Sequence, residues 1–428
     1  MDASSSSQNV TASTTLGEYA TTSASQLSDP APSGSSTERD RSVEESIERS
    51  KSHWSEVVKL DRSIFHKLFK NFYDKEKADN RKVFRELQSH PIWGQFFQTF
   101  GYHLGVPYPG RPGYIYGSSG ELVMGEKFAE GGQAELYHAR VIWANPYHND
   151  NDLKEGIEWV VKVFKKGTSL RQLQVQWPHG YLQYQGEAYS KPNYPRNRRY
   201  FCDVECGVLL KDGRFAFLMQ KEHEDLRCDI ERRMLEIGRD RGPFTKEGGE
   251  MIMYKIAKGM HWLHEHNIVH RDLKSSNVLY RKGGIYVADF ECSIGVIGTG
   301  FWRAPEILQA IKDKKIHERP EVFSREADVY AYGMTCYEIL TGKLPFENHP
   351  LRDYSIVLNG GRPDLPEYVE DWMHELVTRC WDDNPSKRPL FKDILNILTN
   401  HSAIVRDRDN REEQRVMEML EDLRKEDE

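Results

Sequence analysis

Three side chains in the stretch HRDLKSSN have the types and the spacing that phosphate chemistry needs. They are Asp272, Lys274 and Asn277, and a further carboxylate, Asp289, follows after an apolar run. A carboxylate can take the proton of an attacking hydroxyl, an ammonium can neutralise phosphate charge, and amide or carboxylate oxygens suit Mg²⁺. The stretch matches the motif H-R-D-L-x-x-x-N without a gap. It therefore predicts a phosphoryl-transfer site, and its histidines need no bound metal to explain them.

A loop rich in small residues precedes this stretch, in KFAEGGQAELYHARV. Small residues let backbone N–H groups approach a phosphate closely. Gly131 alone keeps its place in the pattern G-x-G-x-x-G, because alanines fill the outer two positions. The loop residues predicted to line a nucleotide site are Phe128, Ala129, Glu130, Gly131, Gly132, Gln133, Ala134 and Leu136.

A single lysine, Lys162, lies among apolar residues in the strand-like run EWVVKVFKK. An isolated lysine in a strand usually faces solvent, but this one follows the loop at the separation from which it would reach the α- and β-phosphates. Such a lysine needs a carboxylate partner. From Val163 through Cys202 the one acidic residue in the sequence is Glu187, which is therefore the predicted partner.

The segment that begins at Asp289 closes on Ala304-Pro305-Glu306. A run expected to form a buried central helix, 327–346, follows it and carries Asp328 near its start, and Arg388 lies further on. In this order, the stretches together resemble a eukaryotic protein kinase domain over residues 122–400. The resemblance implies an α+β fold of two lobes, a small β-rich N-terminal lobe and a larger helical C-terminal lobe.

The resemblance also implies roles for the site residues. Asp272 would orient the attacking hydroxyl or accept its proton, Lys274 would neutralise the γ-phosphate, and Asn277 with Asp289 would hold Mg²⁺. ATP would be the phosphate donor and Lys162 would bind its phosphates. The predicted adenine contacts are Val160, Met219, Leu279 and the connector 220–222, whose last residue is Glu222.

Two structural expectations complete the resemblance. Asp328 would hold the catalytic loop in place, and Arg388 would form an ion pair with Glu306. Trp302 and the later C-W…R-P ending are similar to tyrosine kinases and tyrosine-kinase-like serine/threonine kinases. Lys274 and Thr299 favour the second group, and with it protein substrates that carry Ser or Thr acceptors.

The sequence departs from the family pattern at a few positions that leave alternatives open. Glu291 replaces the glycine of D-F-G, and alanines replace two loop glycines, so a pseudokinase that binds nucleotide as a scaffold is the alternative. A small-molecule kinase is disfavoured, because the A-P-E segment and Arg388 build a platform for protein substrates. Glycine alone adopts positive φ at little cost, so Glu291 is expected to restrict loop switching. Arg271 and Ser293 are the candidate pair for control by loop phosphorylation.

The chain divides by composition into five parts. A Ser/Thr-rich stretch too poor in apolar residues to fold comes first. A helical, aromatic-rich extension follows, which either packs on the next domain or binds an unidentified partner, and then a Gly/Pro linker. The kinase-like domain and a charged C-terminal helix or tail complete the chain. The predicted bounds are 1–42, 43–104, 105–121, 122–400 and 401–428.

Bulk properties exclude several classes of protein. The net charge of −7 is too mild to indicate nucleic-acid binding. The six scattered cysteines are typical of reduced thiols rather than of a disulfide framework. No apolar run is long enough to span a membrane, and no signal peptide is visible. These features predict a cytoplasmic signalling protein without membrane insertion, with access to the nucleus left open.

Overall fold

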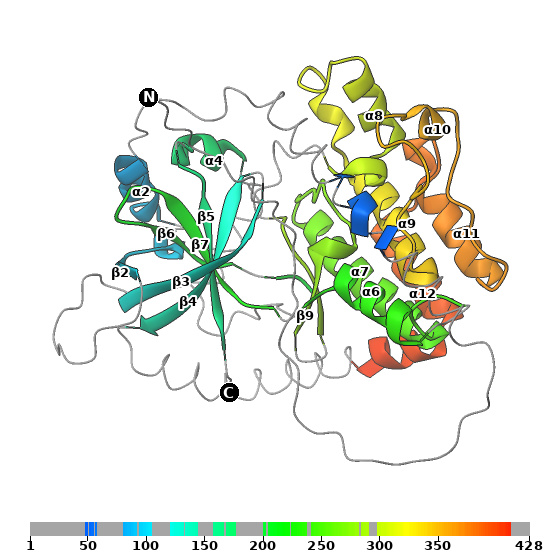
Figure 1. Cartoon of the computed structure of the whole chain (residues 1–428), viewed down its shortest axis with the longest axis horizontal. Coiled ribbons are helices and arrows are strands. Elements are labelled where there is room, and N and C mark those ends of the chain that lie inside the picture. Colours follow the sequence, from blue (N-terminus) through cyan, green and yellow to red (C-terminus); the bar gives the residue numbers. More distant parts are fainter. Residues whose placement is uncertain are drawn as a thin grey trace, which may run out of the picture.

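The computed structural model describes the greater part of the chain. The described residues are 48–49, 51–54, 56–57, 80–91, 94–104, 120–131, 133–143, 157–166, 168–176, 200–202, 204–222, 224–237, 241–281, 284–290 and 298–411. The predicted stretch 1–42 and the linker 105–119 lie outside them. Figure 1 shows two lobes, one built on a sheet and the other on helices, which confirms the predicted two-lobed α+β fold.

The sheet lobe is built from seven strands in the order β1-β6-β7-β5-β4-β3-β2. Only Thr99 separates β1 from β2, although these strands lie at opposite ends of the order. One residue spans about 3.8 Å, so the two edges must meet and the sheet curls towards a closed barrel. The strands are β1 (Phe97–Gln98), β2 (Phe100–Leu104), β3 (Gly120–Glu130), β4 (Ala134–Trp143), β5 (Trp159–Phe164), β6 (Val204–Leu209) and β7 (Phe215–Gln220).

The prediction of a helical extension over 43–104 is wrong for its last part. Residues 97–98 pair in parallel with β6, and residues 100–104 pair in parallel with β3. The aromatic residues there, such as Phe100 and Tyr102, recur at every second position, which is the period of a strand. Two exposed sheet edges were available to them, and pairing satisfies the backbone groups of both edges. The sheet therefore begins before residue 122, the predicted start of the domain.

The preceding helix, α2 (Asn80–Gln88), is as predicted and packs on this sheet. Val83, Phe84 and Leu87 are its buried apolar residues, at the spacing of one helical face. The Phe84 ring meets the Phe97 ring edge-on, with 5.7 Å between centroids. Of the two interpretations of the extension, packing on the next domain therefore holds for α2.

The buried side chain of Asn80 fixes α2 to two loops of the sheet lobe. Its Nδ2 donates to the carbonyls of Thr168 (3.2 Å) and Gly213 (2.8 Å), and its Oδ1 accepts from the backbone N–H of Leu170 at 2.8 Å. Leu170 begins helix α4 (Leu170–Gln176). A single amide thus joins three segments that are far apart in the sequence.

Replacing Asn80 by alanine is expected to lower the free energy of unfolding by about 1–3 kcal/mol, because two carbonyls and one N–H lose their partner. Thermal unfolding of the full chain followed by circular dichroism would measure the change. Arg85→Ala is the matched control, since Arg85 is an exposed residue of the same helix. Equal melting of the Asn80 and Arg85 variants would show that α2 is not an integral part of the lobe.

The helical lobe surrounds α9 (Arg325–Thr341), the predicted central helix. Nearly every residue of α9 is buried, including Asp328 and Glu338. A small sheet of β8 (Glu224–Asp225), β9 (Val278–Arg281) and β10 (Gly284–Val287) lies beside this lobe. The other helices are α6 (Leu226–Ile237), α7 (Lys246–Glu265), α8 (Pro305–Lys312), α10 (Ser355–Leu358), α11 (Asp371–Cys380) and α12 (Phe391–His401).

Short 3₁₀ turns connect several of these elements: η1 (Gly94–Phe96), η2 (Ser275–Asn277), η3 (Gly300–Trp302), η4 (Pro320–Val322) and η5 (Pro385–Lys387). Residues 403–411 continue as a helix after α12, in agreement with the prediction of a charged helix there. Among the helices that the structure describes, none combines the length and the apolar character needed to cross a bilayer.

Candidate active site

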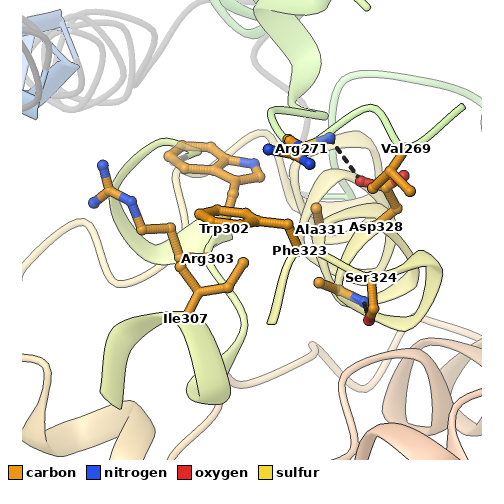
Figure 2. A pocket seen from close by; sticks show the side chains of 10 residues that line it. Val269, Arg271, Trp302, Arg303, Ile307, Phe323, Ser324, Asp328 and Ala331 are labelled. Atoms are coloured by element: carbon orange, nitrogen blue, oxygen red, sulfur yellow. Dashed lines mark hydrogen bonds between the residues drawn. The ribbon is translucent and has the colours of Figure 1, made fainter. Parts of the chain in front are cut away.

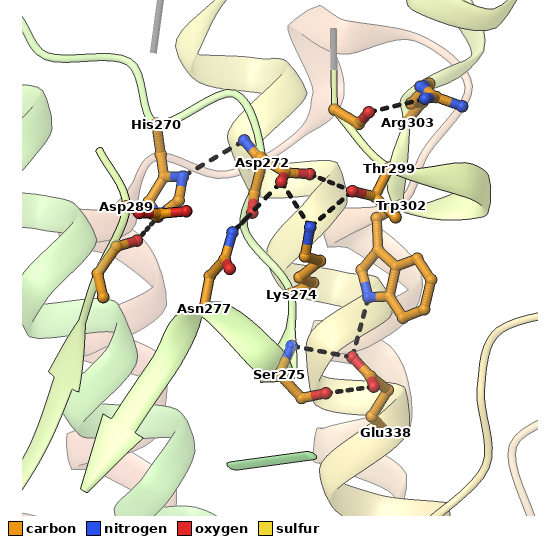
Figure 3. Close-up of polar contacts among 12 residues, drawn as sticks. His270, Asp272, Lys274, Ser275, Asn277, Asp289, Thr299, Trp302, Arg303 and Glu338 are labelled. Atoms are coloured by element: carbon orange, nitrogen blue, oxygen red, sulfur yellow. Dashed lines mark hydrogen bonds and ion pairs between the residues drawn. The ribbon is translucent and has the colours of Figure 1, made fainter. Parts of the chain in front are cut away.

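Asp272 and Lys274 lie together with Thr299, a residue distant in sequence (Figure 3). Lys274 Nζ donates to Asp272 Oδ2 at 2.5 Å and to Thr299 Oγ1 at 2.7 Å. Thr299 Oγ1 in turn donates to Asp272 Oδ1 at 2.6 Å. The three side chains form a closed triangle, so the carboxylate and the ammonium are held in one fixed geometry. Such fixed polar groups are what positioning of a reacting hydroxyl requires.

Asn277 is anchored by the same loop. Its Nδ2 donates to the carbonyl of Asp272 at 2.7 Å and to Asp272 Oδ2 at 3.3 Å. Because the nitrogen is used in this way, the amide oxygen is left for another ligand. Asp289, which follows strand β10, keeps more than half of its side chain exposed. These two oxygen donors fit Mg²⁺, which typically takes one or two protein ligands and completes its shell with phosphate and water.

Lys162 reaches this acidic group from the sheet lobe. Its Nζ lies 2.6 Å from Asp289 Oδ1, and the ammonium lowers the pKa of the Asp289 carboxyl. Lys162 pairs with Phe217 on one side and Leu136 on the other, so the central strand β5 sets its position. The predicted partner, Glu187, lies outside the described residues, and no motif in the sequence relates Lys162 to Asp289 as an ion pair.

The backbone at Asp289 adopts an uncommon conformation, with φ of 70°. Positive φ costs a non-glycine residue about 1 kcal/mol or more, although aspartate tolerates it better than most residues. The preceding residue is fixed on both sides: Ala288 N donates to the Asn277 carbonyl, and the Ala288 carbonyl lies 2.9 Å from His270 Nε2. Glu291, where the family pattern has a glycine, lies outside the described residues.

Asp328 holds the catalytic loop, as predicted. Its carboxylate accepts the backbone N–H groups of His270 and Arg271, both at 2.8 Å, and lies 2.9 Å from His264 Nε2. The Asp328 side chain is almost completely buried. Since α9 carries this carboxylate, the central helix of the lobe determines where the loop that contains Asp272 lies.

A second buried carboxylate on α9, Glu338, was missed by the sequence reasoning. It accepts hydrogen bonds from the hydroxyl and backbone N–H of Ser275 and, at 2.9 Å, from Trp302 Nε1. Arg227 on α6 lies 3.5 Å away and is also buried. Burial raises the pKa of Glu338. The signal was present as a lone charged residue in the apolar run of α9, and it joins the catalytic loop to the segment around Trp302 (Figure 3).

Arg271 lies over a small pocket of the helical lobe (Figure 2). Its guanidinium is 4.8 Å from the centre of the Phe323 ring, and burial lowers the pKa of Arg271. The pocket is also lined by Trp302 and Ser324. Ser293, the predicted phosphorylation partner of Arg271, lies outside the described residues.

The predicted nucleotide-binding residues come together on the sheet lobe. Val160 pairs with Met219, and Leu136 lies beside Lys162 on the neighbouring strand. The loop tip between β3 and β4 is closed by a hydrogen bond from Gly131 N to the Ala134 carbonyl, at 2.8 Å. Phe128 is exposed and its ring lies against His138. Gly132 lies outside the described residues.

The loop tip carries ion pairs that sequence reasoning did not anticipate. Glu130 binds Lys127 at 2.8 Å and Lys165 at 2.7 Å, and these contacts lower the pKa of Glu130 to about 2. They tie the small-residue loop to the end of β5. These ion pairs restrict the backbone of the loop. The loop would have more freedom if glycines filled the two outer positions of the pattern.

The remaining predicted nucleotide-site residues lie on adjoining elements. Ala129 and Glu130 end β3, Gln133 follows the tip with its carbonyl bonded to Lys165 N, and Glu222 lies beyond β7. Leu279 lies in β9, and it pairs with Asp225 of β8 in the small sheet. The connector after β7 therefore leads to β8, the strand that pairs with the one carrying Leu279.

These arrangements define a protein kinase fold, and comparison with known proteins agrees. Residues 211–398 match the family model described as protein tyrosine and serine/threonine kinase. A probable serine/threonine-protein kinase of Dictyostelium discoideum is 41% identical over 159 residues, which are 35% of this chain and 11% of that protein. The serine/threonine/tyrosine-protein kinase HT1 of Arabidopsis thaliana is 34% identical over 164 residues, which are 36% of this chain and 40% of that protein.

A light-sensor protein kinase of Ceratodon purpureus is 33% identical over 247 residues, or 48% of this chain and 18% of that protein. The chain thus spans well under two thirds of the length of each of these relatives. It carries a eukaryotic protein kinase domain, and the resemblance to tyrosine-kinase-like serine/threonine kinases is confirmed.

Proposed function

We propose that this protein transfers the γ-phosphate of ATP to Ser or Thr hydroxyls of protein substrates, with Mg²⁺ as cofactor. The observation that carries the proposal is the triangle of Asp272, Lys274 and Thr299, with Asn277 and Asp289 beside it. A scaffold that only binds nucleotide has no need for a carboxylate and an ammonium held at 2.5 Å in this way. The small-molecule alternative is disfavoured by the intact pair of Arg388 and Glu306.

Each residue contributes one part of the transfer. Asp272 orients the acceptor hydroxyl and takes its proton as the new O–P bond forms and the bond from the γ-phosphorus to the β–γ bridging oxygen breaks, releasing ADP. Lys274 neutralises the γ-phosphate, and Lys162 binds the α- and β-phosphates. A magnesium ion bound by Asn277 and Asp289 would supply further neutralisation of phosphate charge. The Gly131 loop and the Val160–Met219 pair would hold the nucleotide on the sheet lobe.

Acceptor preference tests the proposal. Purified full chain with labelled ATP and Mg²⁺ is expected to phosphorylate a degenerate peptide library with Ser/Thr acceptors at least about tenfold faster than a matched Tyr library. Removal of the metal with EDTA should reduce incorporation to background, because the phosphate charge is no longer neutralised. Preference for the Tyr library would overturn the Ser/Thr assignment, and equal rates with and without metal would overturn the metal requirement.

The setting of this activity is part of the proposal. We place the kinase domain over 122–400 together with α2, β1 and β2, and we assign the protein to cytoplasmic signalling. Among the described residues no cysteine forms a disulfide, which supports a reducing compartment. Glu187 stays the proposed partner of Lys162 in the nucleotide-bound state.

A further inference from the structure

A short helical segment far ahead of the kinase domain lies on the helical lobe. Its described residues are 48–49, 51–54 and 56–57, and we call them the N-terminal segment. Figure 1 shows this segment in dark blue beside α9, whereas α2, which follows it in the chain, lies on the sheet lobe. The chain therefore crosses from one lobe to the other between residues 57 and 80.

Trp54 anchors the segment next to the catalytic loop. Its ring meets the Trp302 ring edge-on, with 5.8 Å between centroids and an interplanar angle of 81°. The ammonium of Lys274 lies 5.8 Å from the centre of the Trp54 ring, within the range of a cation–π interaction. The same ammonium is 2.5 Å from Asp272 Oδ2. Lys274 thus contacts both Trp54 and Asp272, the proposed catalytic carboxylate.

Val57 provides a second contact, on the same helical face as Trp54. It is buried, with 2% of its surface exposed. A Cβ built on Gly300 would lie 3.3 Å from Val57 Cγ1, so the valine packs directly against the glycine backbone. Gly300 follows Thr299, the third member of the catalytic triangle. The segment therefore covers the backbone of η3 as well as Lys274.

The opposite side of the segment is polar. Glu48, Arg49, Lys51 and Glu56 are exposed, whereas His53 is half-buried and burial lowers its pKa. An amphipathic turn with Trp and Val on one face and charges on the other is the pattern of a docked peptide rather than of a core helix. Among its described residues, Trp54 and Val57 are the large apolar side chains that pack on the lobe, and so small a contact permits local release without unfolding of the lobe.

An acceptor hydroxyl must approach Asp272 past Lys274 and the η3 backbone. We propose that the N-terminal segment binds in cis across this protein-substrate surface, through Trp54 and Val57, and thereby competes with protein substrates. The proposal rests on the proposed kinase activity. It also defines the kind of ligand that the surface fits: a short amphipathic helix with an aromatic anchor. The 22 residues from 58 to 79 reach at most about 75 Å, so the tether permits docking and release.

Activity of full-length variants tests the competition. Trp54→Ala is expected to raise kcat/KM for a Ser/Thr peptide about five- to tenfold, because a larger fraction of molecules has the surface free. The KM for ATP should change less than about twofold, since the contacts described do not touch the nucleotide loop. Val57→Asp should have the same effect, and Lys51→Ala, an exposed position of the segment, should match the wild type. If active Trp54→Ala and Val57→Asp proteins both match the wild type or fall below it, the proposal is overturned.

Direct binding separates this proposal from the proposed activity. A fluorescently labelled peptide with the sequence of residues 45–60 is titrated with full-length Trp54→Ala protein and with the wild type. Tighter binding to the variant is expected, because the wild-type surface is already covered, and a peptide with Trp54→Ala should not bind. Equal binding to both proteins, or none, would overturn docking in cis. If no protein transfers phosphate, the proposed function fails, and this titration alone still decides whether the segment docks.

Discussion

Asp272→Asn is expected to reduce phosphate transfer by about 10²–10⁴-fold, to the level of background incorporation. The asparagine keeps the size of the side chain but cannot take a proton. It also removes the charge that Lys274 and the Thr299 hydroxyl contact at 2.5 and 2.6 Å. An amide nitrogen in that place would face the donors of Lys274 and Asn277, so the triangle would lose its geometry as well as its base. Incorporation of labelled phosphate into a Ser/Thr peptide measures the loss.

Two controls distinguish this loss from misfolding. Asp364→Asn makes the same chemical change at an exposed position and should keep wild-type activity. Asp272→Asn protein should still show a thermal shift with ATP and Mg²⁺, because Asn277, Asp289 and Lys162 are intact. Wild-type incorporation by a folded Asp272→Asn protein would remove Asp272 from the catalytic role.

Arg388→Leu is expected to lower the free energy of unfolding by about 3 kcal/mol, since it removes the buried guanidinium that pairs with the partly buried carboxylate of Glu306. Arg388 binds both oxygens of Glu306, at 2.8 and 2.9 Å. It also donates to the carbonyls of Asp382 and Glu326. None of the Arg388 side chain is exposed. The pair connects the end of the A-P-E segment to the segment before α12.

The melting temperature of Arg388→Leu should fall by about 10 °C, measured at a fixed scan rate because large domains often unfold irreversibly. Arg352→Leu is the matched control, since Arg352 is exposed on the same lobe. Arg388→Lys should recover only part of the loss, because an ammonium cannot make the two parallel bonds of a guanidinium. Melting of Arg388→Leu at the temperature of the control would contradict the role given to the pair.

Motifs with strict spacing allowed the helical lobe to be predicted well. The roles of Asp328 as anchor and of Arg388 as partner of Glu306 follow from the family pattern, and the structure confirms both contacts. These contacts join α9 and the elements around it. Buried polar groups need a hydrogen-bond partner, which restricts how each of them can be arranged there. The sheet lobe was less predictable, because residues 97–104 carry aromatic residues that suit a strand or a helix face. Their pairing with β6 and β3 depends on edges that lie far along the chain.

The contacts that sequence reasoning missed share one cause: they join side chains that no motif relates. Glu338 binds Ser275 and Trp302 from a helix expected to contribute only packing and Asp328. Lys162 contacts Asp289, whereas the predicted partner, Glu187, lies outside the described residues. Trp54 belongs to the predicted aromatic-rich extension 43–104, and nothing in its sequence spacing indicates the surface that it covers. Such contacts depend on how the lobes and the extension lie in space, which local periodicity does not encode.

The position of Asp289 bears on what the replacement of the D-F-G glycine by Glu291 does to the site. Within the described part of this segment, Asp289 has positive φ and its side chain contacts Lys162. The predicted metal ligand and its partner are thus in contact in a chain that has Glu291 two residues later, in place of the family glycine. A site that performs phosphate transfer therefore does not require that glycine.

Labelled-phosphate incorporation by wild-type protein should be measured in the same preparation in which a thermal shift with ATP and Mg²⁺ has been recorded. A site that performs the transfer gives both a shift and phosphorylation of Ser/Thr peptides at a rate at least about a hundredfold above that of Asp272→Asn. A clear nucleotide shift with incorporation no greater than that of Asp272→Asn would instead identify the protein as a nucleotide-binding scaffold.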